Sequence, residues 1–200
     1  MSFKANKEIS ILMSFLLVVV ILSGCNSKNE IESNMNVEIN DFTYRNQEGN
    51  SFGSVDLEGK IWLADFVFTS CETVCPPMTF NMSKIQKMLD EENIEIEIVS
   101  FSVDPEIDTP EALRNYAEKF DADFSNWHWL TGYEQEEIED FALNNFKTVV
   151  KKPTNEDQVL HGTSFYLVNQ EGILIKDYSG VSEVPFDEMI NDIKVLSEQN

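Results

Sequence analysis

The chain has 200 residues and a formal net charge of −22, from 36 acidic and 14 basic side chains. So acidic a surface argues against nucleic acid as a partner, because phosphate backbones demand lysine and arginine. It also argues against electrostatic adhesion to anionic lipid. We interpret the acidity as a source of solubility rather than as a docking surface for a cationic partner.

Residues 1–24 predict a lipoprotein signal peptide. A short basic region precedes an apolar run over residues 9–22, which suits a signal-peptide core better than a spanning helix of about 20 apolar residues. The run ends in Leu22-Ser23-Gly24-Cys25, which resembles the lipobox read by bacterial lipoprotein signal peptidase. Cys25 is then lipidated and becomes the first mature residue. The alternative is an uncleaved anchor with an incidental cysteine, and either form places the folded part on the extracytoplasmic face of the cell membrane.

The rest of the chain divides into a tether and one domain. Residues 25–36 are polar and aperiodic, which predicts a lipidated flexible tether. Residues 37–200 are long enough for a single domain with a sizeable core. With Cys25 assigned to lipid, this domain keeps two cysteines, Cys71 and Cys75. So few cysteines indicate a site rather than a disulfide scaffold.

The pattern along residues 37–200 predicts alternating strands and helices after an N-terminal hairpin. In chain order we expect a hairpin (42–44 and 51–52), a strand (61–68), a helix from Pro76 past Leu89, a strand (94–103), a helix (110–120), a short strand (127–130), a helix (138–146), a hairpin (163–168 and 173–178) and a C-terminal helix (186–196). This order predicts a thioredoxin-like α/β fold, a mixed central sheet with helices on both faces. We interpret Met78 and Met82 as core residues rather than metal ligands.

Cys71 and Cys75 stand at the junction of the first long strand and its helix. Side chains four apart on a helical turn lie on one face, close enough to bind one soft metal ion or to form a disulfide. A helix N-terminus stabilises the thiolate that both chemistries need. A permanent structural disulfide is the alternative, but so short a loop restrains the unfolded chain little.

The presence of a third ligand would distinguish a metal site from a redox-active cysteine pair. The chain has two histidines, His128 and His161. His161 lies in the loop before the last hairpin, which approaches the strand-to-helix junction in this fold. Two thiolates and an imidazole suit Cu(I), and they can hold Cu(II) or zinc if a further ligand completes the set. His128 lies between two tryptophans without a cysteine partner, and we interpret it as structural.

Several segments together resemble the Sco/SenC family, nearest to the lipoprotein type of Gram-positive bacteria. The resemblance covers about residues 37–197, and the matching segments are 68–76 (a CxxxC motif followed by proline), 99–105 with Asp108-Thr109-Pro110, His161 with 163–168, Gly172, and 177–180. CxxxC alone is a weak signal, whereas its combination with the Val-Asp-Pro segment and a distal histidine is specific.

The resemblance implies one copper ion per chain, Cu(I) or Cu(II), bound by Cys71, Cys75 and His161. It implies a metallochaperone rather than an enzyme, which assists assembly of the binuclear copper site of cytochrome c oxidase, with the copper-site subunit as partner. We expect a monomer. The alternative is a thiol–disulfide oxidoreductase that reduces the oxidase cysteines, with Cys71 as nucleophile. A peroxidase is disfavoured because Phe68 stands where peroxiredoxins of this fold carry threonine.

Three positions near the motifs need separate interpretation. Many family members carry aspartate directly before the histidine, where this chain has Leu160, so any supporting role of that aspartate is absent or moved. Glu72 follows the first cysteine where aspartate is common, and it is a candidate oxygen ligand. We interpret Asp104 as a turn residue before Pro105.

Overall fold

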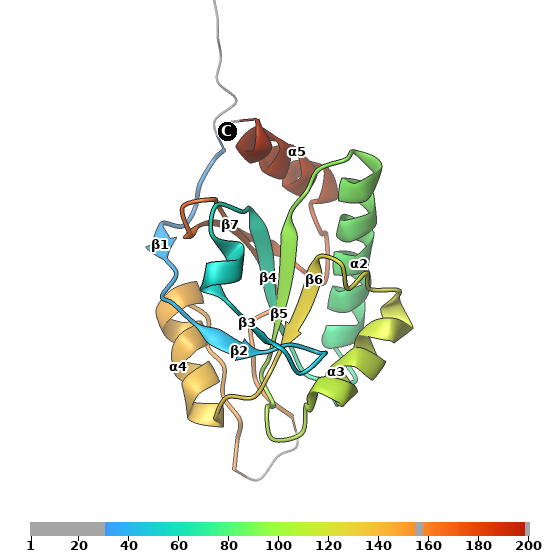
Figure 1. Ribbon diagram of the computed structural model, residues 1–200, viewed down its shortest axis with the longest axis vertical. Coiled ribbons are helices and arrows are strands. Elements are labelled where there is room, and N and C mark those ends of the chain that lie inside the picture. The colour runs from blue at the N-terminus through green and yellow to red at the C-terminus, as the bar shows by residue number, and fades with distance from the viewer. Residues whose placement is uncertain (1–30, 155–157, 199–200) are drawn as a thin grey trace, which may run out of the picture. The chain divides into compact units, whose positions relative to one another are not determined.

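The computed structural model describes residues 31–154 and 158–198. Within them, six strands form a mixed sheet and two form a separate hairpin (Figure 1). The sheet has the order β1 (Val37–Glu38), β8 (Ile173–Ser179), β7 (Ser164–Val168), β4 (Trp62–Val67), β5 (Glu97–Ser102) and β6 (Trp127–Leu130), and the hairpin pairs β2 (Thr43–Arg45) with β3 (Ser51–Gly53). The predicted mixed sheet and N-terminal hairpin are confirmed.

The centre of the sheet is β4, whose six residues are all buried. It runs parallel to β5 and antiparallel to β7, and β6 continues the parallel arrangement beyond β5. Strands covered on both faces read as apolar runs, which explains the composition of this segment. Because β4, β5 and β6 are parallel, the loops that follow them all leave the sheet at the same end, the carboxyl end of these strands.

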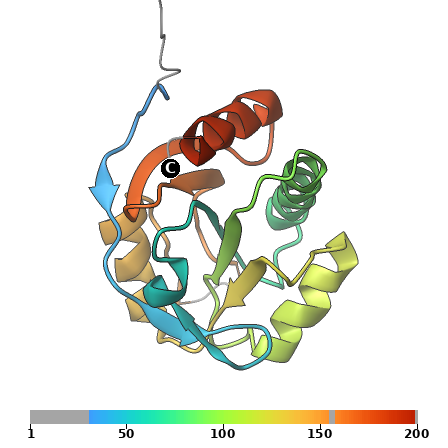
Figure 2. The same cartoon turned by 45° about the horizontal axis from the view of Figure 1, so that its top comes forward.

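Helices cover both faces of the sheet. In Figure 2, α2 (Cys75–Glu91), α3 (Pro110–Ala117) and α5 (Phe186–Ser197) lie on one side, and α4 (Gln135–Phe146) lies on the other with the hairpin. Met78 and Met82 of α2 are fully buried, which confirms them as core residues.

The start of α3 and its end have local causes. Thr109 caps the helix by accepting a hydrogen bond from the backbone N–H of Ala112 at 3.2 Å, and Pro110 takes the first position, where no N–H is needed. The helix was expected through Phe120 but ends at Ala117. The chain continues as a 3-10 turn, which stops where Asp121 adopts a left-handed conformation with φ of 55°.

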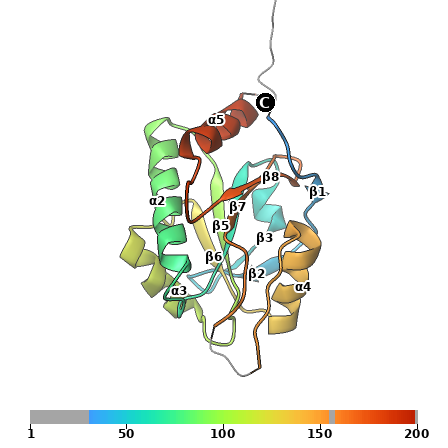
Figure 3. The same ribbon diagram turned by 180° about the vertical axis from the view of Figure 1, so that it is seen from behind.

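The two edges of the sheet are protected in different ways. Along β6, the Gln47 side chain donates to the carbonyl of Trp127 at 3.2 Å and accepts from the N–H of Trp129 at 2.9 Å, which occupies backbone groups that an open edge would expose. Along β8, strand β1 pairs at the other edge (Figure 3). Here the N–H of Met35 also donates to the carbonyl of Ile175 at 3.1 Å, and Asn34 donates to the Asp177 carboxylate at 2.8 Å.

These contacts place residues 33–35 in the folded domain, although the sequence suggests a free tether up to residue 36. The unpaired backbone groups of β8 bind this segment, a pairing that polar composition does not reveal. The predicted signal peptide, and Cys25 with it, lie outside the described residues. Among the residues that the structure describes, no helix combines the length and the apolar character needed to cross a membrane.

Candidate metal centre

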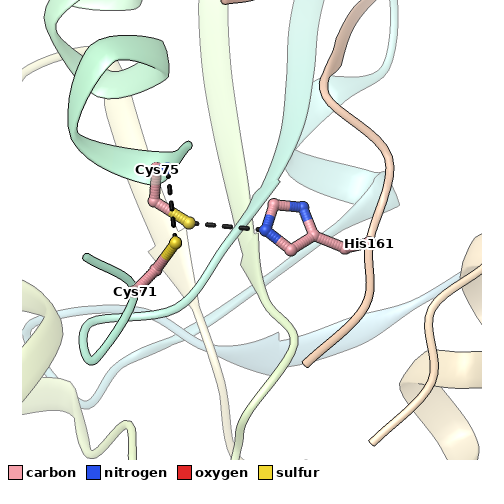
Figure 4. A group of neighbouring side chains, drawn as sticks. All are labelled: Cys71, Cys75 and His161. Atoms are coloured by element: carbon pink, nitrogen blue, oxygen red, sulfur yellow. Dashed lines mark hydrogen bonds between the residues drawn. The ribbon is translucent and has the colours of Figure 1, made fainter. Parts of the chain in front are cut away.

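Sheet order brings together two segments that are about 90 residues apart in sequence. Cys71 lies in the loop that follows β4, and Cys75 is the first residue of α2. His161 lies in the loop that precedes β7. Because β7 runs antiparallel beside β4, the residues that enter β7 lie next to those that leave β4. The three side chains therefore converge at the carboxyl ends of the parallel strands (Figure 4).

The three candidate ligands are close enough to share one ion. Their ligand atoms all lie within 4.8 Å of one another. The sulfur of Cys75 lies 3.4 Å from His161 Nε2, and the backbone N–H of Cys75 donates to the sulfur of Cys71 at 3.4 Å. Both cysteines are free thiols and buried, whereas His161 is partly exposed. The structure thus brings together all three residues that the sequence selected.

The two thiols differ in acidity. The hydrogen bond with the Cys75 side chain lowers the pKa of Cys71 well below its usual range. Burial opposes this shift, and hydrogen bonds from backbone N–H groups add to it. The same hydrogen bond and burial raise the pKa of Cys75. Cys71 is therefore the more acidic thiol of the pair, and the N–H that donates to its sulfur belongs to Cys75, the first residue of α2.

The orientation of His161 suits ligation through Nε2. Its Nδ1 lies 2.8 Å from the carbonyl oxygen of Gly162, an acceptor, so Nδ1 carries the hydrogen and donates. This tautomer leaves the lone pair of Nε2 directed at the cysteines. The edge of the imidazole packs against the Phe68 ring with 5.6 Å between ring centres, which further limits rotation.

An ion pair joins the segment before His161 to the loop after β5. Lys152 Nζ lies 2.7 Å from Asp104 Oδ1, and Asp104 is buried. Lys151 and Leu160 exchange two backbone hydrogen bonds of 2.8 and 2.9 Å, which hold the chain directly before His161. Asp104 is in a turn as predicted, but it also binds Lys152. The sequence does not reveal this ion pair, because its partners are 48 residues apart.

The other positions singled out in the sequence lie outside this group. The metal-ligand group formed by described residues consists of Cys71, Cys75 and His161, without Glu72. Leu160 has 63% of its surface exposed. His128 stacks on Phe52 at 3.8 Å and lies 2.9 Å from the Glu97 carboxylate, so its structural interpretation agrees with its contacts.

Sequence reasoning missed a buried carboxylate beside this group. Asp65 of β4 is fully buried, and neither of its oxygens has a hydrogen-bond partner among the described residues. Burial raises the pKa of Asp65 to about 7, while nearby Ser100 and His161 offset part of the rise. The available signal was an acidic residue inside the otherwise apolar run of residues 61–68.

The donor set fits a soft metal ion. Thiolates and a neutral imidazole favour copper or zinc over hard cations such as magnesium and calcium, which take oxygen ligands. Three protein donors, without an evident fourth among the described residues, suit trigonal Cu(I) better than the tetrahedral sites of structural zinc. A thioredoxin-like domain with two cysteines and a histidine at this junction defines a class of protein that binds a soft metal or exchanges disulfides.

Comparison with known proteins narrows this class. The family model described as SCO1/SenC matches residues 31–198. The crystal structure of a SCO1/SenC family lipoprotein from Bacillus anthracis str. Ames is 50% identical, with a TM-score of 0.82 over 84% of this chain and 99% of that one. BsSco, a member of the Sco family of cytochrome c oxidase assembly proteins in which a disulfide switch was identified, is 50% identical, with a TM-score of 0.80 over 86% and 100% of the two chains.

A more distant relative was solved with its metal. ScoI from Bradyrhizobium japonicum, solved with copper bound, is 25% identical, with a TM-score of 0.66 over 80% of this chain and 99% of that one. The chain described here belongs to the SCO1/SenC family, and its fold is thioredoxin-like. Cys71, Cys75 and His161 form a group that could hold copper.

Proposed function

We propose that this protein is a copper-binding assembly factor for the binuclear copper site of cytochrome c oxidase. Cys71, Cys75 and His161 hold one copper ion, and the protein passes it to the copper-site subunit of the oxidase. The observation that carries the proposal is the convergence of two sulfurs and one correctly oriented imidazole nitrogen within 4.8 Å. The naming of BsSco, at 50% identity, as a member of a family of cytochrome c oxidase assembly proteins supports the choice of partner.

The site combines burial with access, as transfer requires. Cys75 is fully buried and Cys71 is 5% exposed, whereas His161 is partly exposed. Buried thiolates bind a soft ion tightly, and the exposed imidazole offers a position where an incoming ligand can replace a protein ligand. Transfer then proceeds by ligand exchange, in which each bond to a donor sulfur breaks as a bond to an acceptor thiolate forms.

Location follows from the predicted N-terminus. We propose that Cys25 carries a lipid and that residues after it connect the domain to the extracytoplasmic face of the cell membrane, as a monomer. The description of the Bacillus anthracis relative as a lipoprotein supports this anchor. Since the acidic domain is not attracted to anionic lipid, the covalent lipid has to provide attachment.

The second candidate is a thiol–disulfide oxidoreductase acting on the same oxidase cysteines, and the acidity of Cys71 favours it. The Cys71 thiolate would attack an acceptor disulfide and release one acceptor thiolate. Cys75, after losing its proton, would then attack the Cys71 sulfur, which releases the second thiolate and leaves a Cys71–Cys75 disulfide. Two electrons pass to the acceptor, and the protein is oxidised to the same extent.

His161→Ala separates the two functions, because it removes a copper ligand and keeps both thiols. The assay mixes the protein with the purified copper-site domain of the oxidase subunit. One arm starts from copper-loaded protein and reduced acceptor, and the other from copper-free reduced protein and oxidised acceptor. Copper delivery predicts that His161→Ala abolishes copper transfer, with His128→Ala as the matched control that transfers normally. The oxidoreductase would be favoured if the wild type transferred no copper and if His161→Ala reduced the acceptor stoichiometrically at the wild-type rate.

A further inference from the structure

Asp108 connects the carboxyl ends of three parallel strands, β4, β5 and β6. It lies in the loop between β5 and α3 and is fully buried. Its carboxylate accepts hydrogen bonds from the Thr69 hydroxyl at 2.6 Å and from the Ser102 hydroxyl at 2.6 Å, and it also accepts from the Thr69 backbone N–H at 3.2 Å. Its backbone carbonyl accepts from the Thr131 hydroxyl at 2.7 Å. We call these four residues the Asp108 clamp.

The clamp holds its carboxylate without a counter-ion. Within residues 31–154 and 158–198, no lysine, arginine or histidine forms an ion pair with Asp108. An uncharged side chain would lose less hydration on burial, so a carboxylate at this place costs stability. Burial raises the pKa of Asp108, and the hydrogen bonds from Ser102 and Thr69 offset part of this rise. In return, the carboxylate holds Thr69, which follows β4, and Ser102, at the end of β5, in a fixed position relative to each other.

The clamped segment is the one that carries the first cysteine. Thr69 is bound through both its backbone and its side chain, two residues before Cys71. The N–H of Cys71 donates to the carbonyl of Phe68 at 3.2 Å, which closes a turn with Thr69 at its second position. The orientation of this turn decides where the Cys71 sulfur lies relative to the N–H of Cys75, 3.4 Å away. Within the described residues, the hydrogen bonds that Thr69 donates all go to the Asp108 carboxylate.

We propose that Asp108 is a positioning residue of the copper site, which sets the place of Cys71 through Thr69. The inference rests on the proposed copper binding at Cys71, Cys75 and His161. Within the part of the chain that the structure describes, the hydrogen-bond partners of the Asp108 carboxylate are Thr69 and Ser102 rather than the ligands, so Asp108 acts through the turn. Residues that support metal ligands in this way change metal affinity by about 10- to 100-fold when they are removed.

The test compares Asp108→Ala, Asp108→Asn and Thr69→Val in the full-length chain, purified in detergent. The matched control is Asp192→Asn, which alters another buried carboxylate, bonded to Lys176 and Tyr178 on the α5 side of the sheet. Anaerobic copper titration gives the affinity, and the sulfur-to-copper charge-transfer band of the Cu(II) form reports the geometry. Iodoacetamide labelling of copper-free reduced protein, read by peptide mass spectrometry, gives the reactivity of Cys71 independently of copper.

We expect Asp108→Ala and Thr69→Val to lower copper affinity by at least about tenfold, to shift the charge-transfer band and to slow Cys71 labelling. Asp108→Asn keeps an oxygen for Thr69 and should lie closer to wild type. Asp192→Asn should lower thermal stability while leaving band and labelling rate unchanged. If Asp108→Ala fails to fold, Thr69→Val still decides.

The inference would be overturned if Thr69→Val and Asp108→Ala kept the copper affinity, the charge-transfer band and the Cys71 labelling rate of the wild type. It would also be overturned if Asp192→Asn changed these three quantities as much as Asp108→Ala does. If the wild type itself binds no copper, the proposed function fails, and the labelling rates alone decide whether Asp108 positions Cys71.

Discussion

The buried carboxylate of Asp65 makes the stability of the copper-free protein depend on pH. Its pKa is about 7 in the folded state, against 3.8 for the ordinary side chain. Between these values the unfolded chain has lost the proton while the folded chain keeps it, so stability falls as pH rises. Each pKa unit corresponds to about 1.4 kcal/mol. The loss between pH 5 and pH 7 is therefore about 2 kcal/mol, since half of the folded molecules still hold the proton at pH 7, and it levels off at about 3 kcal/mol by pH 8.

Asp65→Asn removes this titration and keeps the size of the side chain. We expect wild type and variant to be closest in stability at pH 5, and the variant to gain on the wild type by about 3 kcal/mol between pH 5 and pH 8. The assay is urea unfolding of reduced, copper-free protein at several pH values, followed by tryptophan fluorescence. Glu95→Gln at an exposed position is the control and should show no such trend.

A stability difference between Asp65→Asn and wild type that stays constant from pH 5 to pH 8 would refute the reasoning. It would mean that Asp65 has the same pKa in the folded and unfolded chains, so that other interactions cancel the rise in pKa caused by its burial. An inverted trend, in which the variant loses stability relative to wild type as pH rises, would mean that the ionised form is the one that the fold stabilises.

Three further substitutions test separate parts of the account. Met82→Leu should cost less than about 1.5 kcal/mol and leave copper stoichiometry at one, because Met82 fills the core; a lower stoichiometry would make it a ligand. Lys176→Ala should cost about 3 kcal/mol in urea unfolding, because Asp192 loses a buried partner at 2.6 Å, and a cost below about 1 kcal/mol would show the pair to be dispensable. His128→Ala should leave the copper affinity measured by titration unchanged, and weakened binding would contradict its structural interpretation.

The elements and the three candidate ligands were predictable because they depend on local patterns. The apolar run of residues 61–68 marks a strand covered on both faces, and the prolines after Cys75 mark the start of the next helix. The helical turn expected to carry both cysteines is wrong in part, because α2 begins at Cys75 and Cys71 lies in the loop before it. His161 could be selected because the chain has only two histidines and the fold brings its loop to that junction. Boundaries were less predictable, as the 3-10 end of α3 shows.

The supporting contacts were not predictable, because each joins distant segments. Asp108 and Thr69 are 39 residues apart, and Lys152 and Asp104 are 48 apart, so neither pairing follows from spacing or periodicity. Asp108 appeared in the sequence only as part of a motif, and its role depends on three strands ending at the same edge. The same holds for Gln47, whose side chain replaces a strand neighbour along β6.

X-ray absorption spectroscopy of the copper-loaded protein at the copper edge tests the central claim most directly. The account predicts one copper ion per chain with two sulfur scatterers and one imidazole, because Cys71, Cys75 and His161 converge within 4.8 Å. In His161→Ala the imidazole signal should disappear while both sulfurs remain, and in Cys71→Ser one sulfur should be lost. A copper environment of nitrogen and oxygen alone, or one that these two substitutions leave unchanged, would contradict the account.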